Sequence, residues 1–296
     1  MSKQRRFLRL GLAFALLMGA GADRAIAVAY QATLLATPTP SYANAYGVSG
    51  TSIVGGSSPG ALLWNGAANT YVSLNPGPDW TSFANAVDGS HQVGSGQPSG
   101  SNEHALLWNG TAASYVDLHP DGFADSLARG VSGNTQVGSG LPNSNIGSGG
   151  IHALLWHGTA ASAVDLSSAA YFLSEALGVG GNLQVGYGSG STTGGNNHAL
   201  VWQGTAASVV DLHSFLGPEF VSSVAEGVDA SGRIVGYAIT TDSSAYAVEW
   251  TPVPEPATCM LAVIGLAAVG GCRRGRTANS RSPSSIIPRA RRSSSA

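Results

Sequence analysis

The feature that most constrains the fold of this chain is a unit that occurs five times between residues 43 and 250. Each unit contains a short apolar segment that ends in tryptophan, and consecutive tryptophans are 44, 48, 46 and 48 residues apart. Repeats of this length are typical of solenoids and propellers, in which each unit buries its apolar side chains against its neighbours. The segments are Ala61–Trp64, His104–Trp108, His152–Trp156, His198–Trp202 and the divergent Tyr246–Trp250.

Each unit is predicted to form four short strands. Besides the tryptophan segment it contains an Ala-x-Gly-Val segment and a Val-Gly pair, and the first four units also contain a Val-x-Leu step, with Gly, Asn, Asp and Ser between these parts. Short apolar runs bounded by turn-forming residues indicate strands. The Val-x-Leu steps begin at Val72, Val116, Val164 and Val210; the Ala-x-Gly-Val segments begin at Ala45, Ala84 (with Ala in place of Gly), Ala128, Ala176 and Ala225; the pairs begin at Val54, Val93, Val137, Val185 and Val235.

These strands predict an all-β fold, a five-bladed β-propeller with four-stranded repeats of about 46 residues within residues 28–252. The composition agrees, because 41 glycines and only 10% charged residues disfavour a helix-rich enzyme. The fifth unit ends at Trp250 without a Val-x-Leu step, and Tyr30–Leu35 resembles the missing piece. If Tyr30–Leu35 pairs with the last unit, the ring closes and exposed strand edges are removed. An open solenoid with atypical ends is the alternative.

Charge is distributed unevenly along the chain. Of the 14 Lys and Arg residues, five lie in residues 1–24 and seven in residues 273–292. Residues 30–252 therefore hold two arginines against 14 carboxylates, a net charge of −12. Such a region repels nucleic acid and anionic lipid, so nucleic acid is excluded as a partner. The two cysteines, Cys259 and Cys272, lie outside this region, which excludes a disulfide framework within it.

The N-terminus has the pattern of a secretory signal peptide over residues 1–27. Four basic residues precede an apolar stretch at 10–20, and Ala25-Ile26-Ala27 is a small-x-small cleavage site. Sec-dependent export across the inner membrane is expected. A retained anchor and a twin-arginine signal that includes Arg5 and Arg6 are the alternatives.

The C-terminus has three consecutive parts. Val253-Pro254-Glu255-Pro256 is followed by an apolar run over 257–271, which predicts a single, short transmembrane helix. The basic residues Arg273, Arg274 and Arg276 then act as a stop-transfer signal on the cytoplasmic side. Residues 277–296 are rich in Ser and Arg and are predicted to be disordered.

This order of parts resembles the bacterial PEP-CTERM sorting signal, also described as the ice-binding protein C-terminal domain, over residues 252–276. The resemblance implies processing by an exosortase-type enzyme, transient attachment to the membrane, and final residence in the envelope, at the outer surface or in the extracellular matrix. The tail after Arg276 departs from the family, in which such signals normally end the chain. A C-terminal anchor that is never cleaved is the alternative.

The repeated tryptophan segment resembles the HAF repeat of extracellular bacterial proteins over residues 43–250. Leucine stands at the third position in the three units that have histidine, and the first and last units lack the histidine. The resemblance favours a propeller-like fold and brings no catalytic residues with it.

Conspicuous polar residues recur in phase with the unit, which indicates structural roles. A ring would hold equivalent histidines one blade apart, too far to share a metal ion. Each in-phase aspartate is predicted to accept backbone N–H groups in the turn that follows it. No metal site and no cofactor are predicted. These residues are His104, His152 and His198, and Asp117, Asp165 and Asp211.

Residues that break the repeat are better candidates for function. Several carboxylates lie before or within an Ala-x-Gly-Val segment. Glu175 and Glu226 lie there too, although they are not included in the ligand face named below. Trp80 either stacks on a sugar ring or packs in the core. We expect a non-catalytic binding or structural protein with a glycan or protein ligand; the alternative is a glycosidase that uses two of these carboxylates. The proposed ligand face comprises Asp79, Trp80, Asp121, Asp125 and Glu219.

Overall fold

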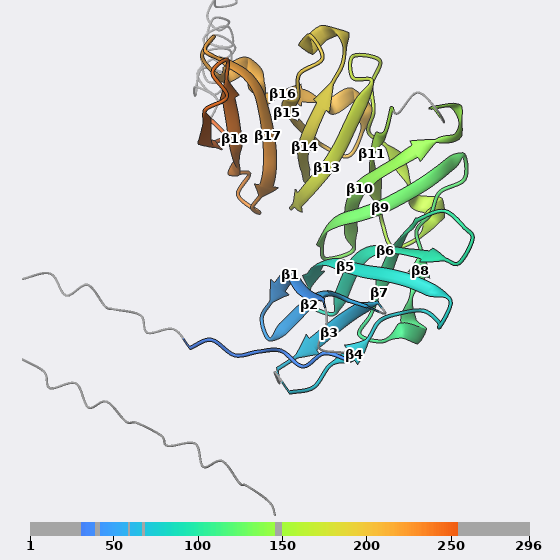
Figure 1. Cartoon of the computed structure of the whole chain (residues 1–296). Coiled ribbons are helices and arrows are strands. Elements are labelled where there is room, and N and C mark those ends of the chain that lie inside the picture. Colours follow the sequence, from blue (N-terminus) through green and yellow to red (C-terminus); the bar gives the residue numbers. More distant parts are fainter. Residues whose placement is uncertain (1–30, 39–41, 59, 67–68, 146–149, 254–296) are drawn as a thin grey trace, which may run out of the picture.

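A computed structural model describes residues 31–38, 42–58, 60–66, 69–145 and 150–253. These residues form 19 β-strands and short 3₁₀ turns, with no α-helix among them, so the predicted all-β class is confirmed. The strands build five antiparallel sheets, one for each unit of the sequence (Figure 1). Sheets 1 to 4 have four strands each, as predicted, and sheet 5 has three.

Within every sheet the strands pair in chain order. Sheet 1 consists of β1 (Ala43–Ser49), β2 (Ser52–Ser57), β3 (Ala61–Asn65) and β4 (Val72–Ser73). Sheet 2 consists of β5 (Trp80–Asp88), β6 (His91–Pro98), β7 (His104–Trp108) and β8 (Val116–Asp117). Sheet 3 consists of β9 (Phe123–Ser132), β10 (Thr135–Pro142), β11 (His152–Trp156) and β12 (Val164–Asp165). Sheet 4 consists of β13 (Leu173–Gly180), β14 (Leu183–Ser189), β15 (His198–Trp202) and β16 (Val210–Asp211). Sheet 5 consists of β17 (Phe220–Val228), β18 (Ile234–Thr240) and β19 (Ala245–Trp250).

The first strand of each sheet carries a β-bulge within its Ala-x-Gly-Val segment. In sheet 1, Ala45 pairs with Gly55 and Gly47 pairs with Val54, so Tyr46 is the extra residue. The bulge brings the carbonyl oxygen of the residue before the alanine onto the glycine of the Val-Gly pair. A Cβ on Gly138 would lie 1.9 Å from the Leu127 carbonyl oxygen. The Val-Gly glycine is therefore required for a close backbone approach.

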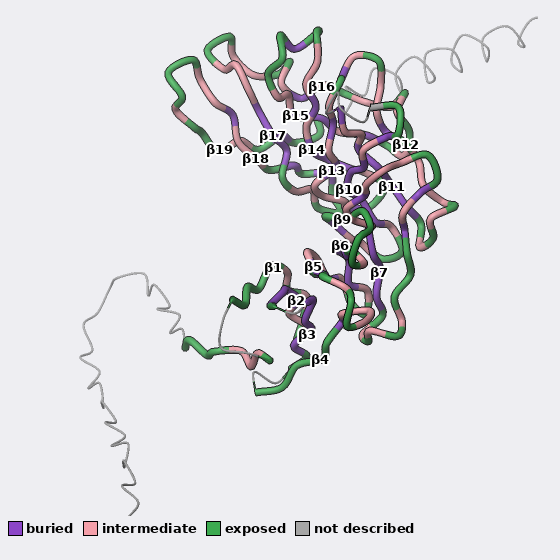
Figure 2. Tube along the Cα trace, turned by 45° about the vertical axis from the view of Figure 1, so that its right-hand side comes forward, coloured by how far each residue is buried: buried purple, intermediate pink, exposed green. Residues whose placement is uncertain are grey.

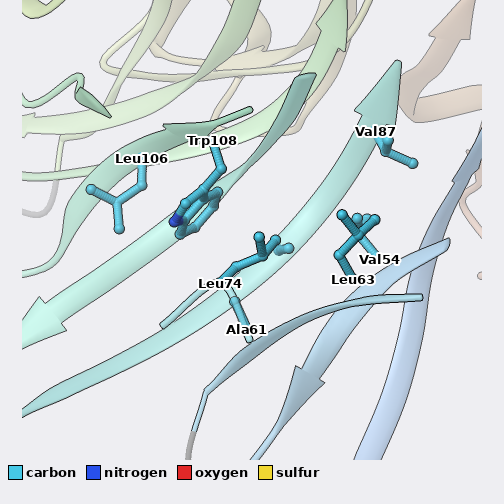
Figure 3. Packing of buried hydrophobic residues seen from close by; sticks show 8 residues of the cluster. Val54, Ala61, Leu63, Leu74, Val87, Leu106 and Trp108 are labelled. Carbon is cyan, nitrogen blue, oxygen red and sulfur yellow. The ribbon is translucent and has the colours of Figure 1, made fainter. Parts of the chain in front are cut away.

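The core lies between consecutive sheets and repeats with them. Between sheets 1 and 2, Val54, Leu63 and Leu74 of sheet 1 pack with Leu106 and Trp108 of sheet 2 (Figure 3). Trp108 and Leu106 are fully buried. The same residue types form the cores between sheets 2 and 3 and between sheets 3 and 4. Sheets 2 to 4 thus each contribute one face to the core before them and one to the core after them.

The first strands form the inner side of the array, since β1 contacts β5, β5 contacts β9, β9 contacts β13 and β13 contacts β17. Figures 1 and 2 show the five sheets in chain order along an arc, with sheets 1 and 5 at its two ends. Buried residues lie along the middle of the arc, and exposed residues lie on the turns (Figure 2). Closure into a five-bladed ring stays a prediction.

The predicted closing strand Tyr30–Leu35 is wrong in the part that the structure describes. Residues 31–37 are assigned to no strand, and Tyr30 lies outside the described residues. The segment contacts sheet 1 rather than sheet 5, because the Ala36 carbonyl accepts a hydrogen bond of 2.6 Å from the Trp64 indole N–H. In the described structure the segment therefore lies beside sheet 1 and forms no ladder with β19.

Three other predictions concern residues outside the described part of the chain. These are the signal peptide over 1–27, the transmembrane helix over 257–271 and the disordered tail over 277–296. Within the described residues, no helix has the length and apolar character needed to cross a bilayer.

Candidate functional site: the histidine motifs and the inner strip

The in-phase histidines and aspartates join the third and fourth strands of their sheets. In sheet 2 the Nδ1 atom of His104 lies 2.7 Å from Oδ2 of Asp117. His152 with Asp165, and His198 with Asp211, repeat this distance in sheets 3 and 4. The other oxygen of Asp117 accepts the backbone N–H of His119, two residues on, which confirms the predicted turn contact. The direct pairing was not predicted from the sequence, although a constant separation of 13 residues is its signal.

A second histidine stacks on the first in two of the sheets. His119 lies parallel to His104 with ring centroids 4.0 Å apart, and His213 lies on His198 at the same distance. Nδ1 of His119 lies 2.8 Å from the Ser126 hydroxyl. Burial lowers the pKa of both His119 and His213, and the adjacent histidine lowers it further. Both rings therefore favour the neutral form in the folded chain.

The serine at the end of this contact bridges two sheets. The Ser126 hydroxyl accepts the backbone N–H of Ala105, which lies in the preceding sheet, and Ser82, Ser174 and Ser223 repeat the bond. In sheet 1, Asn75 takes the place of the second histidine and accepts the Ser82 hydroxyl at 2.7 Å. An amide and an imidazole thus make the same contact with the serine. The second histidine therefore serves to hold this serine in place.

This geometry differs from that of a catalytic triad. A triad needs aspartate on one ring nitrogen of the histidine and the nucleophilic hydroxyl on the other. In sheet 3 both Asp165 and Ser167 lie on the same atom, Nδ1 of His152, at 2.7 and 2.9 Å. Ser126 is buried and already accepts an amide. The described histidine motifs are therefore arranged to hold strands and sheets together.

The predicted ligand-face residues lie at the beginnings of first strands. Asp79 is exposed and precedes β5, and Trp80 is the first residue of β5. The Trp80 ring packs on the core between sheets 1 and 2, and its centroid lies 5.8 Å from that of Tyr115. Trp80 thus has the core-packing role that was the alternative to sugar stacking.

The other members of this face are spread over sheets 3 and 5. Asp121 is exposed in the turn before β9, and Glu219 is exposed before β17. Asp125 in β9 accepts the backbone N–H of Glu103 at 3.1 Å, and both residues line a groove of about 390 Å³. Asp125 and Glu103 are the carboxylates that share a groove here, and Glu103 was absent from the predicted set. The ligand role of all these residues stays a prediction.

The bulges define a second set of residues, which we name the inner strip. They occupy the x position of Ala-x-Gly-Val, and five units carry five different residue types there: Tyr46, Asn85, Arg129, Leu177 and Glu226. Two of them reach the next sheet, because Asn85 donates to the Ala128 carbonyl at 2.9 Å and Arg129 lies 3.6 Å from Glu175. In the sequence, this set can be recognised because position x varies from unit to unit within an otherwise repeated segment.

Charge is concentrated near the middle of the inner strip. Glu175 is largely shielded, with 12% of its side chain exposed, and it pairs with Arg129 across sheets 3 and 4. Burial and the nearby Glu175 raise the pKa of Tyr187 to about 12, so its hydroxyl stays protonated. Within the described residues, no three His, Cys, Asp or Glu side chains gather closely enough to hold a metal ion. The five residues of the inner strip offer hydroxyl, amide, ionic and apolar groups.

Five sheets built from one sequence unit define an all-β repeat protein. Residues 252–276 match the PEP-CTERM protein-sorting motif, so this repeat protein carries that motif directly after its last sheet. The motif indicates export, processing by an exosortase and sorting to the cell surface or extracellular space. The resemblance to HAF repeats stays a prediction.

Other comparisons add little. No curated protein matches the chain. A solved structure of a puromycin hydrolase mutant complexed with PGG is 14% identical and has a TM-score of 0.34. It covers 64% of this chain, which in turn spans 28% of the hydrolase chain. A likeness at this level carries no argument about fold or function.

Proposed function

We propose that the chain is an exported, exosortase-sorted surface or matrix protein that acts as a non-catalytic binding or structural module. One observation carries the proposal. The polar residues that recur in the units form hydrogen bonds between strands and sheets, whereas the inner-strip positions differ in every unit. Repeat proteins use such variable positions on a constant scaffold for ligand contacts.

The ligand that fits this proposal is a glycan or a protein. Tyr46 and Arg129 are exposed on the inner strip and supply a ring and a cation, and Glu226 supplies an exposed carboxylate. Asp125, a member of the predicted ligand face, lies on the same strand as Arg129. An aromatic ring together with cationic and anionic side chains suits the alternating apolar and hydroxyl surface of a sugar chain.

Each sheet is proposed to act as a propeller blade, with Sec export and a membrane-spanning C-terminal helix before processing. Closure of one chain into a five-bladed ring requires sheet 5 to meet sheet 1. The alternative within this proposal is a purely structural surface component that binds no specific ligand.

A glycan and protein-ligand screen of the purified chain tests the binding role. We expect a ligand whose binding falls at least tenfold when Tyr46 and Arg129 are both changed to Ala. The matched control is Val210→Ala, a half-exposed side chain on the fourth strand of sheet 4. Binding that is equally reduced by the control, or absent for every glycan and protein tested, would exclude the strip as a ligand site.

A glycosidase is the competing function, and one observation favours testing it. Glu103 and Asp125 line one groove, and glycosidases need two carboxyl groups within about 10 Å of each other. Hydrolysis of any glycan that disappears in both Glu103→Gln and Asp125→Asn variants would establish the enzyme and refute the non-catalytic proposal.

A further inference from the structure

Among the residues that the structure describes, sheet 5 has no equivalent of the fourth strand of sheets 1 to 4. In the described part of the chain β19 pairs only with β18, so one edge of β19 has unpaired N–H and C=O groups. In sheet 2 the equivalent strand β7 pairs with β8 on that edge. The edge of β19 is therefore a vacant strand position.

An apolar groove of about 590 Å³ lies beside this edge. It is lined by core residues shared between sheets 4 and 5, among them Leu212, Val248 and Trp250. In the two preceding cores, Ala163 and Val209, which come directly before a fourth strand, help to cover this region. The groove is open because sheet 5 has no fourth strand to bring such a residue.

The outer flank of sheet 5 keeps features that fit a following sheet. The Val-Gly valines of sheets 1 to 4 are fully buried by the next sheet, but Val235 of sheet 5 is 50% exposed. A Cβ on Gly178 would lie 2.9 Å from the bulge carbonyl of the next sheet, whereas one on Gly227 would meet only Val235, at 3.8 Å. Gly227 and Val235 of sheet 5 thus correspond to residues that contact a following sheet in sheets 1 to 4. The described part of the chain supplies no such sheet after sheet 5.

The opposite end of the arc has the complementary surface. Val48 of sheet 1 is 70% exposed, while its equivalent Val87 in sheet 2 is buried by sheet 1. The Trp64 indole bonds to the Ala36 carbonyl as the Trp250 indole bonds to the carbonyl of Leu212, which directly follows a fourth strand. Residues 31–36 therefore lie where the fourth strand of a preceding sheet would end, and Leu34 is 96% exposed.

We propose that residues 31–36 of a second copy of this chain add to β19 as the missing fourth strand, while sheet 1 of that copy covers the flank of sheet 5. A second copy fits better than the same chain, because sheets 1 and 5 of one chain lie at opposite ends of the arc and residues 31–36 lie with sheet 1, away from β19 (Figures 1 and 2). Main-chain hydrogen bonds at a vacant edge supply affinity, and apolar pockets supply register. The contact joins different surfaces of the two copies, so it repeats head to tail.

One charged pair distinguishes this contact from the cores inside the chain. Glu249 occupies the position of the core leucines Leu63 and Leu107, and it pairs with Arg233 at 2.7 Å. A charged pair on an otherwise apolar flank costs desolvation free energy when it is covered. The contact between copies is therefore weaker than the sheet–sheet contacts within one chain, and Glu249→Leu should strengthen it.

Cross-linking between two differently tagged full-length chains tests the proposal. Both chains carry Cys259→Ser and Cys272→Ser, which removes every native thiol; one also carries Leu34→Cys and the other Tyr246→Cys. Tyr246 takes the position of His104, whose partner Asp117 lies on the fourth strand, and both chosen side chains are exposed. After treatment of the detergent-solubilised mixture with a short bis-maleimide, we expect at least ten times more mixed product than with the control pair Leu34→Cys and Val210→Cys.

Two further measurements make the outcome decisive. Val235→Asp should reduce the mixed product several-fold, while Val210→Asp, also at a half-exposed valine, should leave it unchanged; circular dichroism shows that each variant is folded. A chain carrying both Leu34→Cys and Tyr246→Cys reports on self-closure. A product within single chains, with mixed product no higher than the control, would overturn the proposal in favour of a closed five-bladed ring. Absence of either product would overturn it as well.

Discussion

The Val-Gly glycine provides the sharpest test of how the units fold, and Gly138→Ala is the change that probes it. The new methyl carbon would lie 1.9 Å from the Leu127 carbonyl oxygen, whereas real Cβ contacts are essentially never under 3.0 Å. The main chain of the bulge must therefore move by about 1 Å. Because the obstacle is backbone, we expect a cost at the upper end of over-packing, about 3 kcal/mol.

A smaller effect acts in the opposite direction. Replacing glycine by alanine lowers the entropy of the unfolded chain and stabilises a compatible site by about 0.4–1 kcal/mol. The expected net loss for Gly138→Ala is about 2 kcal/mol, which lowers Tm by about 4–8 °C in a domain of this size. Gly227→Ala is the matched control, because its methyl would meet only Val235, at 3.8 Å. Its Tm should stay the same or rise slightly.

Thermal unfolding followed by circular dichroism measures both variants. If the Gly138→Ala and Gly227→Ala proteins had the same Tm, the close approach of the Leu127 carbonyl oxygen would not require glycine at position 138. The explanation of the repeated Val-Gly pair would then be wrong.

Three other predictions follow from the cores, the histidines and the inner strip. Leu106→Ala removes a fully buried side chain and should cost about 2–5 kcal/mol in chemical unfolding, whereas an equal Cm to wild type would contradict the core described here. Burial lowers the pKa of His119 and His213 below 6.5, so the unfolded chain binds protons more readily, and stability should fall as the pH drops below about 6.5. The double variant His119→Asn, His213→Asn copies Asn75 of sheet 1 and should lose part of that pH dependence while remaining folded at neutral pH; an unchanged pH profile would exclude these rings as its source. Arg129→Ala breaks an ion pair of 3.6 Å at an exposed side chain and should change the free energy of unfolding by less than about 1 kcal/mol, so a larger loss in denaturant titration would assign Arg129 to the scaffold.

The strand content and the unit boundaries were predictable because the repeat averages out local ambiguity. One Ala-Leu-Leu-Trp segment is compatible with a helix, but five tryptophan segments in phase, with turn residues between them, indicate strands. The four-stranded sheets and the structural role of His104 and Asp117 followed from that periodicity. The sorting motif was readable because Val253–Pro256 and the arginines occur in a fixed order.

The remaining features depend on geometry between units, which a linear pattern does not contain. The bulge at Tyr46 is a shift in register, and its alanine and glycine could equally belong to a regular strand. The N-terminal segment was assigned to the last unit by its likeness to a Val-x-Leu step; residues 31–37 form no strand, and Ala36 accepts the Trp64 indole of the first unit. Trp80 breaks the repeat, and the packing of its ring against the core between sheets 1 and 2 is visible only in the structure.

The β-bulge also separates two tasks that most folds must reconcile. Alanine and glycine on either side of position x make the close contacts of the scaffold, while the residue at x differs in every unit. Where its side chain is exposed, as at Tyr46 and Glu226, replacing it alters the surface of the array at little cost in folding free energy. Duplication of a whole unit would lengthen the array without changing either end. The chemistry of these surface positions and the length of the array are thus set by different parts of the unit.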